Sequence, residues 1–269
     1  MKQLYGLLGE SLKHSISPEI HSLIFKEMNI DGYYHLFEVQ RDNLKDAVYG
    51  LKALGAKGAN VTIPYKIPAM EYVDELSPEA EKIGSINTIC FEDNKTKGYN
   101  TDYYGFGMLL NKNQVKISNK KAVILGSGGA AKSVLQYLVD KGIGEITIVS
   151  RDKDALKANA SFKDFKLMCY SELMQLKEED IIINSTPCGM YPNVDNSPIS
   201  RDIVNNFSVA VDLIYNPCET VFLKFARESN LTYMNGLYML VGQAVCAEEI
   251  WNGIKISEKI IDKIYNQLK

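Results

Sequence analysis

A lysine and an aspartate are the residues of this sequence best suited to moving a proton. Lys66 closes the segment Asn60–Lys66 and Asp102 closes the segment Tyr99–Asp102, each just beyond a predicted strand end. Ligands of open α/β sheets gather at the carboxyl ends of strands. Oxidising an alcohol carbon by hydride transfer requires a group that accepts the hydroxyl proton, or returns it in the reverse direction. We therefore predict that Lys66 and Asp102 are the catalytic pair of a dehydrogenase acting on a small polar substrate.

Two divisions of labour remain open for this pair. Either Lys66 takes and returns the proton, or it chiefly polarises the substrate oxygen while Asp102 orients it. Taken alone, each charged side chain would ordinarily be a solvated surface group. Nearby hydroxyl and amide side chains, which suit the binding of hydroxyl groups, favour the functional interpretation; they are Asn60, Thr62, Asn87, Asn100 and Thr101.

A glycine turn predicts a dinucleotide site. The segment Gly126-Ser-Gly-Gly-Ala-Ala131 follows an apolar run and precedes a helix-compatible stretch. In this fingerprint one glycine turns the chain tightly, another lets backbone N–H groups approach a pyrophosphate, and a small third residue permits close packing of helix on strand. The strand, turn and helix in this order favour a cofactor site over an ordinary glycine turn.

The end of the following strand bears on the choice of cofactor. An NAD-binding protein usually presents a carboxylate to the ribose hydroxyls there, whereas this chain has Ser150-Arg-Asp-Lys153. Arg151 can stack on adenine and pair with a 2′-phosphate, with added charge from Lys153 and a hydrogen bond from Ser150. NADP is therefore favoured. Because Asp152 would repel that phosphate, strict selectivity against NAD stays open.

The pattern of apolar segments along the chain predicts an α/β scaffold with two domains that positions the candidate site residues. Apolar runs of strand length alternate with amphipathic segments of helical length, which is typical of an α/β protein with largely parallel sheets. We expect an amino-terminal α/β substrate-binding domain over 1–102 and 237–269, and a Rossmann dinucleotide-binding domain over 103–236, joined by a helix near 103–110. Strands are expected over 4–9, 33–39, 58–62 and 85–91, with a hairpin turn over 93–98, and then over 122–125, 145–149, 166–170, 181–184, 209–213 and 231–234.

Helix ends and helical spacing predict four further elements. Ser17 is expected to cap the free N–H groups of a helix over 16–24, with Pro18 in its first position. The segments 130–141, 237–251 and 257–268 also read as helices, and the last two are expected to pack on the amino-terminal domain.

Composition argues against several classes of function. Of the 269 residues, 46% are hydrophobic, and the lysines are dispersed among acidic residues at a net charge of −3, so no basic stripe indicates a nucleic-acid partner. The five cysteines lie far apart, with no histidine at metal-ligand spacing, so we expect reduced thiols in a cytoplasmic protein and no metal site. Neither a secretory signal nor a run of ~20 apolar residues indicates a membrane. Monomer and homodimer both remain open.

Seven segments resemble shikimate dehydrogenases, in order and over essentially the whole chain. The resemblance implies NADP-dependent, reversible reduction of 3-dehydroshikimate to shikimate in the chorismate pathway to aromatic amino acids. The segments are His14–Pro18, Gly58–Lys66, Asn87–Thr88, Asn100–Asp102, Asn184–Met190, Val211–Pro217 and Asn235–Gln243.

The resemblance also implies roles for substrate-site residues. Ser15 and Ser17, together with Tyr215, would hold the substrate carboxylate, and Lys66 would be catalytic. Two serine hydroxyls at a helix start suit an anion, because partial positive charge collects there. The ring hydroxyls would be bound by Thr62, Asn87, Asp102 and Gln243.

On the cofactor side, the resemblance implies three groups of residues. The loop Gly126, Ser127, Gly128, Gly129 and Ala130 would hold the pyrophosphate. The adenosine phosphate would lie on Ser150, Arg151 and Lys153, and the nicotinamide side on Thr186, Leu213, Gly236 and Met239. For Met239 a place in the core is an equally good interpretation. Cys188 in the same region is not expected to act as a nucleophile, because hydride transfer needs none.

Two alternative functions remain open. A quinate or dual quinate/shikimate dehydrogenase would share Lys66, Asp102 and the cofactor turn, although Ser15, Ser17 and Thr62 favour shikimate, which lacks quinate's additional hydroxyl beside the carboxylate. A catalytically silent sensor of nucleotide and metabolite is compatible with the same scaffold. Retention of both Lys66 and Asp102 argues against the sensor, because recognition needs no proton transfer.

Overall fold

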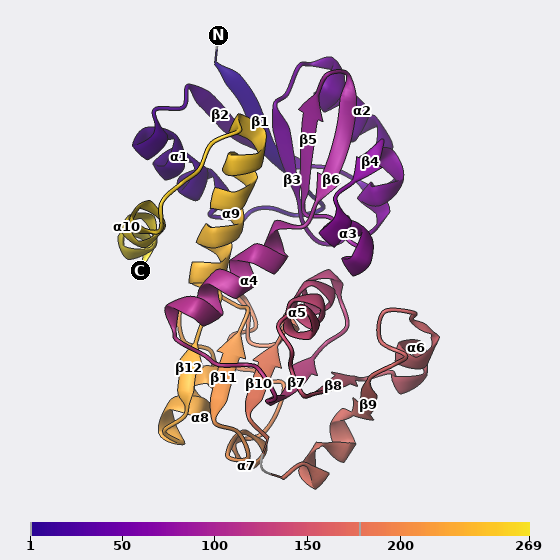
Figure 1. Ribbon diagram of the computed structural model, residues 1–269, viewed down its shortest axis with the longest axis vertical. Helices are drawn as coiled ribbons and strands as arrows, with labels where there is room; N and C mark the ends of the chain where they lie inside the picture. The colour runs from indigo at the N-terminus through magenta and orange to yellow at the C-terminus, as the bar shows by residue number, and fades with distance from the viewer. Residues whose placement is uncertain (1, 178) are drawn as a thin grey trace. The chain divides into compact units, whose positions relative to one another are not determined.

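The computed structural model describes residues 2–177 and 179–269, and the chain forms two compact units (Figure 1). Unit 1 comprises the residues up to Gly105 together with Leu240–Lys269, and unit 2 comprises Phe106–Met239. The chain leaves unit 1 within helix α4 (Thr101–Lys112) and returns to it within helix α9 (Leu237–Asn252). The predicted two-domain α/β fold is confirmed.

Unit 1 contains a six-stranded sheet. Neighbouring strands are parallel in the β1–β2, β1–β3 and β4–β6 pairs and antiparallel in the β3–β5 and β5–β6 pairs, so this sheet is mixed and not largely parallel as expected. In spatial order the strands are β2 (Gly32–Glu38), β1 (Gln3–Gly9), β3 (Gly58–Val61), β5 (Thr88–Glu92), β6 (Lys95–Tyr99) and β4 (Glu75–Leu76).

The helices of unit 1 connect these strands and include the carboxyl-terminal end of the chain. The predicted packing of the last two helices on the amino-terminal domain is confirmed: α9 packs on the sheet, and α10 contacts α1. The helical segments besides α4 and α9 are α1 (Ser17–Met28), η1 (Arg41–Asn43), α2 (Leu44–Ala53), η2 (Pro68–Tyr72), α3 (Pro78–Ile83) and α10 (Glu258–Leu268).

Gly58 and Trp251 fix α9 against this sheet. A Cβ atom on Gly58 would lie 2.0 Å from Trp251 Nε1, so only glycine leaves room for the indole. The indole is almost fully buried and donates from Nε1 to the carbonyl of Ile89 at 2.9 Å. This contact holds α9 against the sheet, where Gln243 and Glu248 of the same helix contact Asn87 and His21.

Two local expectations for unit 1 are wrong. The turn expected over 93–98 is confined to Asp93 and Asn94, with φ angles of +51° and +60°, and the residues from Lys95 pair with β5. A two-residue hairpin loop favours left-handed conformations, which Asp and Asn tolerate. Ser17 does not cap α1, because it is the first residue of the helix and Ile16 occupies the N-cap position without a side-chain hydrogen bond.

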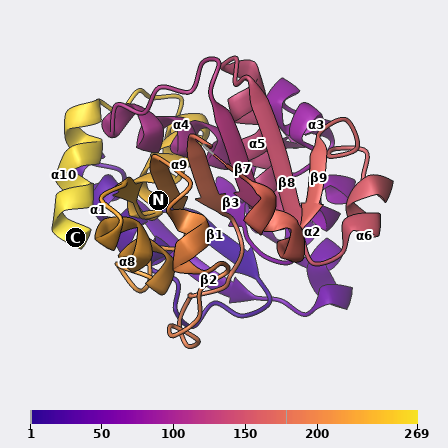
Figure 2. The same cartoon turned by 90° about the horizontal axis from the view of Figure 1, so that it is seen from below.

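Unit 2 contains the predicted six-stranded, doubly wound sheet, and all of its strand pairs are parallel. The sheet reverses its strand order between β7 and β10, where open α/β sheets bind ligands. In Figure 2, β7, β8 and β9 follow one another and α6 lies beyond β9. The spatial order is β12 (Thr232–Met234), β11 (Val209–Asp212), β10 (Ile181–Asn184), β7 (Lys121–Leu125), β8 (Glu145–Ser150) and β9 (Lys166–Cys169).

The apolar strands of unit 2 are covered by short helices and loops. Val123, Ile182 and Ala210 from three adjacent strands are fully buried in one core cluster with Phe222 from α8. The helical segments lying entirely in this unit are α5 (Gly129–Asp140), α6 (Lys153–Ala158), η3 (Tyr170–Gln175), α7 (Arg201–Val204) and α8 (Val221–Glu228). Within residues 2–177 and 179–269, no helix is long and apolar enough to cross a membrane.

Candidate functional site

The structure brings Lys66 and Asp102 into direct contact. Lys66 Nζ lies 2.5 Å from Asp102 Oδ2, and the two side chains are 16% and 9% exposed. Asp102 lies in the first turn of α4, where the helix dipole stabilises a carboxylate. Lys66 follows β3, and its carbonyl accepts from the N–H of Ile86 at 2.8 Å. The pair is therefore partly shielded from water but still reachable.

Asn87 fixes the aspartate from its other side. Its Nδ2 donates to Asp102 Oδ1 at 2.9 Å, while its Oδ1 accepts from the backbone N–H of Thr101 at 2.7 Å. The second bond sets the orientation of the amide, so only the NH2 group faces the carboxylate. Asn87 Nδ2 also lies 3.3 Å from Oε1 of Gln243 on α9. Four of the predicted residues, Lys66, Asn87, Asp102 and Gln243, thus form one hydrogen-bonded cluster.

Ser15 and Ser17 form a second, smaller group at the start of α1. The hydroxyl of Ser15 donates to that of Ser17 at 3.1 Å, and Ser15 Oγ accepts the Ser17 N–H at 3.3 Å. The two hydroxyls lie at a helix amino terminus, where N–H groups without intrahelical partners favour an anion. This local geometry suits a carboxylate.

Thr62 lies at the carboxyl end of β3 and is half-buried, with its N–H donating to the carbonyl of Leu8 at 2.9 Å. Asn60, two residues earlier, is buried. Its Nδ2 donates to Thr88 Oγ1 at 3.0 Å and to the Asn87 carbonyl at 3.3 Å. Asn60 therefore supports the Asn87 segment from within the sheet.

In unit 2 the glycine turn connects β7 to α5. Gly126 has a φ of +105°, and a Cβ atom there would lie 2.9 Å from Ser185 Oγ. At Gly128, the N-cap of α5, a Cβ atom would meet no atom within 4 Å. The first glycine is thus required by the turn itself, whereas the second leaves the backbone accessible. Residues 126–130 therefore present the amino terminus of a 12-residue helix to an anion.

The side chains that follow β8 differ in whether they are free to bind a cofactor phosphate. Lys153 Nζ is held by both carboxylate oxygens of Glu172 at 2.9 Å. The backbone N–H of Cys169 and then Lys153 lower the pKa of Glu172 to about 2, so this carboxylate stays ionised and offsets the lysine charge. Asp152 caps α6 by accepting from two backbone N–H groups of its first turn. Arg151 is exposed and forms no ion pair within residues 2–177 and 179–269, so it is the available cation.

The loops after β10 and β11 are fixed by a buried aspartate. Asp212 accepts from Asn184 Nδ2 at 3.0 Å, and Asn184 Oδ1 in turn accepts from the hydroxyl of Thr186 at 2.6 Å. Burial raises the pKa of Asp212 to about 7. Burial, followed by the Asp212 carboxylate, raises the pKa of Cys188, which disfavours a nucleophilic thiolate.

Leu213 and Gly236 lie in close backbone contact, because a Cβ atom on Gly236 would be 2.0 Å from the Leu213 carbonyl oxygen. Only glycine permits this approach. Met239 is 7% exposed, and Tyr215 is half-buried. The structure therefore places Thr186, Leu213 and Gly236 on connected loops at the carboxyl ends of neighbouring strands.

Comparison with known proteins identifies the family. Residues 7–89 match the model of the shikimate dehydrogenase substrate binding domain, and residues 109–211 match the shikimate / quinate 5-dehydrogenase model. A curated relative from Clostridium perfringens, named shikimate dehydrogenase (NADP(+)), is 52% identical over 99% of this chain and 98% of its own length. The chain belongs to the shikimate dehydrogenase family.

Solved structures of shikimate dehydrogenases agree with this assignment. A chorismate mutase/shikimate 5-dehydrogenase fusion protein from Clostridium acetobutylicum matches with a TM-score of 0.97 and 50% identity, covering 100% of this chain and 97% of that one. A shikimate 5-dehydrogenase from Listeria monocytogenes, solved with shikimate and NAD, has a TM-score of 0.87 and 32% identity over 100% and 96% of the two chains.

Two residues of this shikimate dehydrogenase family member gain importance only in the structure. Asn60 was expected only as one of several hydroxyl-binding side chains near Lys66 and Asp102, and no site role was predicted for Asp212. Asn60 is a buried amide in a strand whose other residues are apolar or glycine, and Asp212 is a fully buried carboxylate at a strand end. A polar residue inside an otherwise apolar strand is the sequence signal that could have identified both, because buried polar groups require partners.

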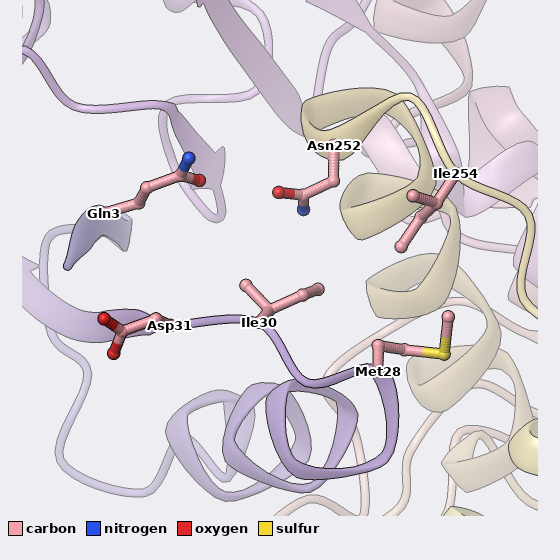
Figure 3. Close-up of a pocket in the computed structure, with 6 residues that line it drawn as sticks. All are labelled: Gln3, Met28, Ile30, Asp31, Asn252 and Ile254. Carbon is pink, nitrogen blue, oxygen red and sulfur yellow. The ribbon is translucent and has the colours of Figure 1, made fainter. Parts of the chain in front are cut away.

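A hollow elsewhere in unit 1 contains none of the predicted site residues. It has a volume of about 400 Å³ and is lined by Gln3, Met28, Ile30, Asp31, Asn252 and Ile254 (Figure 3). The amide side chains of Gln3 and Asn252 face each other across it. The hollow is thus distinct from the Lys66–Asp102 cluster. Among the described residues, no group of three or more His, Cys, Asp or Glu side chains could hold a metal.

Proposed function

We propose that this protein catalyses the NADP-dependent, reversible reduction of 3-dehydroshikimate to shikimate, a step of the chorismate pathway to aromatic amino acids. The observation that carries the proposal is the Lys66–Asp102 pair inside a cluster of amide and hydroxyl side chains. A ring with several hydroxyl groups and one carboxylate needs donors and acceptors of both kinds. Family membership and the name of the Clostridium perfringens relative support the same reaction.

In this proposal unit 1 binds the substrate. Ser15 and Ser17 hold the carboxylate at the amino terminus of α1, with a contribution from Tyr215, and the ring hydroxyls are bound by Thr62, Asn87, Asp102 and Gln243. Asn87 and Asp102 are already fixed by the cluster, so little side-chain freedom is lost when the substrate binds. The corresponding functional domains are 1–102 with 237–269 for the substrate and 103–236 for the cofactor.

Lys66 is the proposed proton-transfer residue. Its ammonium is held by Asp102 and lies at the reachable side of the cluster. During oxidation of shikimate a neutral lysine accepts the hydroxyl proton, and in the reverse direction its ammonium returns a proton to the carbonyl oxygen. Asp102 orients Lys66 by accepting a hydrogen bond from its Nζ. Of the two roles that the sequence left open for Lys66, we thus propose proton transfer and not polarisation of the substrate oxygen alone.

The residues of unit 2 fit a phosphate-bearing dinucleotide. The open backbone at Gly128 and the amino terminus of α5 suit a pyrophosphate held by residues 126–130. Arg151, with Ser150, suits a 2′-phosphate, and Thr186, Leu213, Gly236 and Met239 are assigned to the nicotinamide side. NADP supplies the hydride acceptor when it is bound. The contribution first expected from Lys153 is reduced, because Glu172 already neutralises it.

We further propose that the protein acts on a small molecule as a cytoplasmic monomer or homodimer, without a nucleic-acid partner.

The proposal is tested by initial rates of pyridine-nucleotide reduction with shikimate or quinate, each with NADP or NAD. We expect shikimate with NADP to give the highest kcat/KM. Comparable rates with quinate would indicate dual specificity, and no turnover in any combination would contradict the proposed function.

A further inference from the structure

A second buried polar cluster in unit 1 has no role in the site described above. His21 on α1 and Glu248 on α9 are both fully buried, and His21 Nδ1 lies 2.6 Å from Glu248 Oε1. The second carboxylate oxygen accepts from Asn252 Nδ2 at 2.9 Å. A carboxylate accepts only, so we place the ring proton on Nδ1. The remaining ring nitrogen, Nε2, is buried without a hydrogen-bond partner among the described residues.

Such a pair is not explained by stability alone. Removing a histidine and a carboxylate from water is costly, and well-packed apolar side chains at the same positions are often equally stabilising. The surroundings would suit apolar residues, because Phe25 and Trp251 lie close to the histidine ring. A buried ionisable pair in such surroundings suggests that it fixes a neighbour in one position.

That neighbour is Tyr34. The rings of His21 and Tyr34 are stacked, with centroids 3.8 Å apart and planes inclined by 11°. The Tyr34 hydroxyl donates to Asn60 Oδ1 at 2.7 Å, and the Ser17 side chain lies near enough to it to lower its pKa. Burial, followed by the Glu248 carboxylate, raises the pKa of Tyr34 well above its usual value of 10, so its hydroxyl keeps the proton that it donates.

Tyr34 therefore joins two parts of the proposed substrate site. On one side, Ser17 contacts Ser15, the other candidate for the substrate carboxylate. On the other side, Asn60 donates to the backbone of Asn87, which holds Asp102. A tyrosine ring that is free to rotate would leave both contacts poorly defined. A ring fixed by stacking on His21 keeps the contacts with Ser17 and Asn60 in one geometry.

We propose that His21 and Glu248 position Tyr34, and through it two parts of the proposed substrate site: Ser17 at the carboxylate end, and Asn60, which supports Asn87, at the ring-hydroxyl end. The inference rests on the proposed function and assigns positioning residues, not catalytic ones. The path is Glu248 to His21 by hydrogen bond, His21 to Tyr34 by ring stacking, and Tyr34 to Asn60 by hydrogen bond, with Ser17 close to the same hydroxyl.

Tyr5 provides a matched control for Tyr34. The two tyrosines are directly paired in the register of β1 and β2. The Tyr5 hydroxyl lies 2.8 Å from Asn252 Oδ1 and also close to Gln3 Oε1, and it can donate its one proton to either, away from the serines and Asn60. Tyr5→Phe and Tyr34→Phe thus remove the same group from neighbouring positions of one sheet, but only the second contacts the proposed substrate site.

The test compares KM for shikimate, KM for NADP, kcat and melting temperature in the wild type and in the variants Tyr34→Phe, Tyr5→Phe, Glu248→Leu and Glu248→Gln. Loss of one hydrogen bond to a positioned group should raise KM for shikimate roughly five- to tenfold in Tyr34→Phe and Glu248→Leu, with kcat and KM for NADP within about twofold. Glu248→Gln retains an acceptor for Nδ1 and should stay close to the wild type. The double variant Tyr34→Phe with Glu248→Leu should not exceed the larger single effect, because both act along one path.

A purely structural role predicts another pattern. In that case Tyr5→Phe and Tyr34→Phe would lower the melting temperature alike and leave the ratio of the two KM values unchanged, which would overturn the inference. Should Glu248→Leu fail to fold, the two tyrosine variants decide alone. If the wild type turns over shikimate but the variants show unchanged KM values, only the positioning role is rejected. Absence of wild-type turnover rejects the proposed function itself.

Discussion

Lys66 and Asp102 occupy unequal positions, and this inequality supports different roles. Asp102 has a donor on each carboxylate oxygen, Lys66 on one and Asn87 on the other. Lys66 is the more exposed of the two, at 16% against 9%. A carboxylate fixed from two sides is suited to orienting a partner, whereas the lysine retains access to a substrate hydroxyl. The geometry therefore favours Lys66 as the proton-transfer group.

At the same scale, Arg151 should control the preference for NADP. Arg151→Ser removes the available cation after β8, so KM for NADP should rise about tenfold, the loss expected for one charge-assisted hydrogen bond, while KM for NAD changes little. Lys153→Ser is the matched control, because Glu172 already holds that lysine. Steady-state kinetics with both cofactors provide the measurement. Equal effects of the two substitutions would contradict the assignment.

Asp212 should make the stability of unit 2 depend on pH. Its pKa rises from 3.8 to about 7 on burial, so the folded protein binds this proton more tightly than the unfolded chain does. The free energy of unfolding should therefore fall as pH rises between these two values, by up to about 4 kcal/mol. Denaturant titrations at several pH values would show this slope, and Asp212→Asn should flatten it.

The control for that experiment is Asp164→Asn, at an exposed position before β9. This substitution should leave the slope in place. If wild-type stability instead rises through this pH range and Asp212→Asn does not alter the profile, the buried carboxyl is not the source of the dependence.

At the scale of elements, the turn between β7 and α5 uses its glycines for different purposes. Gly126→Ala forces a side chain onto a positive φ and against Ser185, and it should lower the free energy of unfolding by about 1–3 kcal/mol. Gly128→Ala meets open space and should leave stability nearly unchanged. It should nevertheless raise KM for NADP, because the new methyl group obstructs the approach of a pyrophosphate to the backbone.

Thermal unfolding and cofactor kinetics of the two variants test this distinction. We expect the larger loss of stability in Gly126→Ala, and a higher KM for NADP without a loss of stability in Gly128→Ala. Unchanged affinity for NADP in Gly128→Ala would argue that the phosphates lie elsewhere.

Elements with a clear apolar pattern could be predicted from the sequence, and those defined by pairing could not. The strands of unit 2 are short apolar runs bounded by polar or turn residues, and all six were expected at nearly their observed positions. Strand β6 has the sequence Lys-Thr-Lys-Gly-Tyr, which carries no apolar run, and it exists because it pairs with β5 across a two-residue turn. The two-residue strand β4 was missed for the same reason.

At the scale of the whole molecule, contacts between distant residues limited the prediction of the site. Lys66 and Asp102 could be paired because both were placed just beyond strand ends among hydroxyl and amide side chains. The partners of Lys153 and His21 could not, because Glu172 lies on η3 and Glu248 lies 227 residues after His21. These contacts depend on how helices pack on the sheets, which single-residue patterns do not specify. The chain order of the two units followed from the resemblance and from the position of the glycine turn.

The proton-transfer role of Lys66 is tested by separating the binding of shikimate from its turnover. We would measure kcat and the dissociation constant for shikimate in the wild type, in Lys66→Ala and in Lys57→Ala, a control at a surface lysine just before the same strand. Lys66→Ala should lose at least about 100-fold in kcat, the usual contribution of a general acid–base group, while shikimate still binds and Lys57→Ala resembles the wild type. Retention of wild-type kcat in Lys66→Ala would contradict the account.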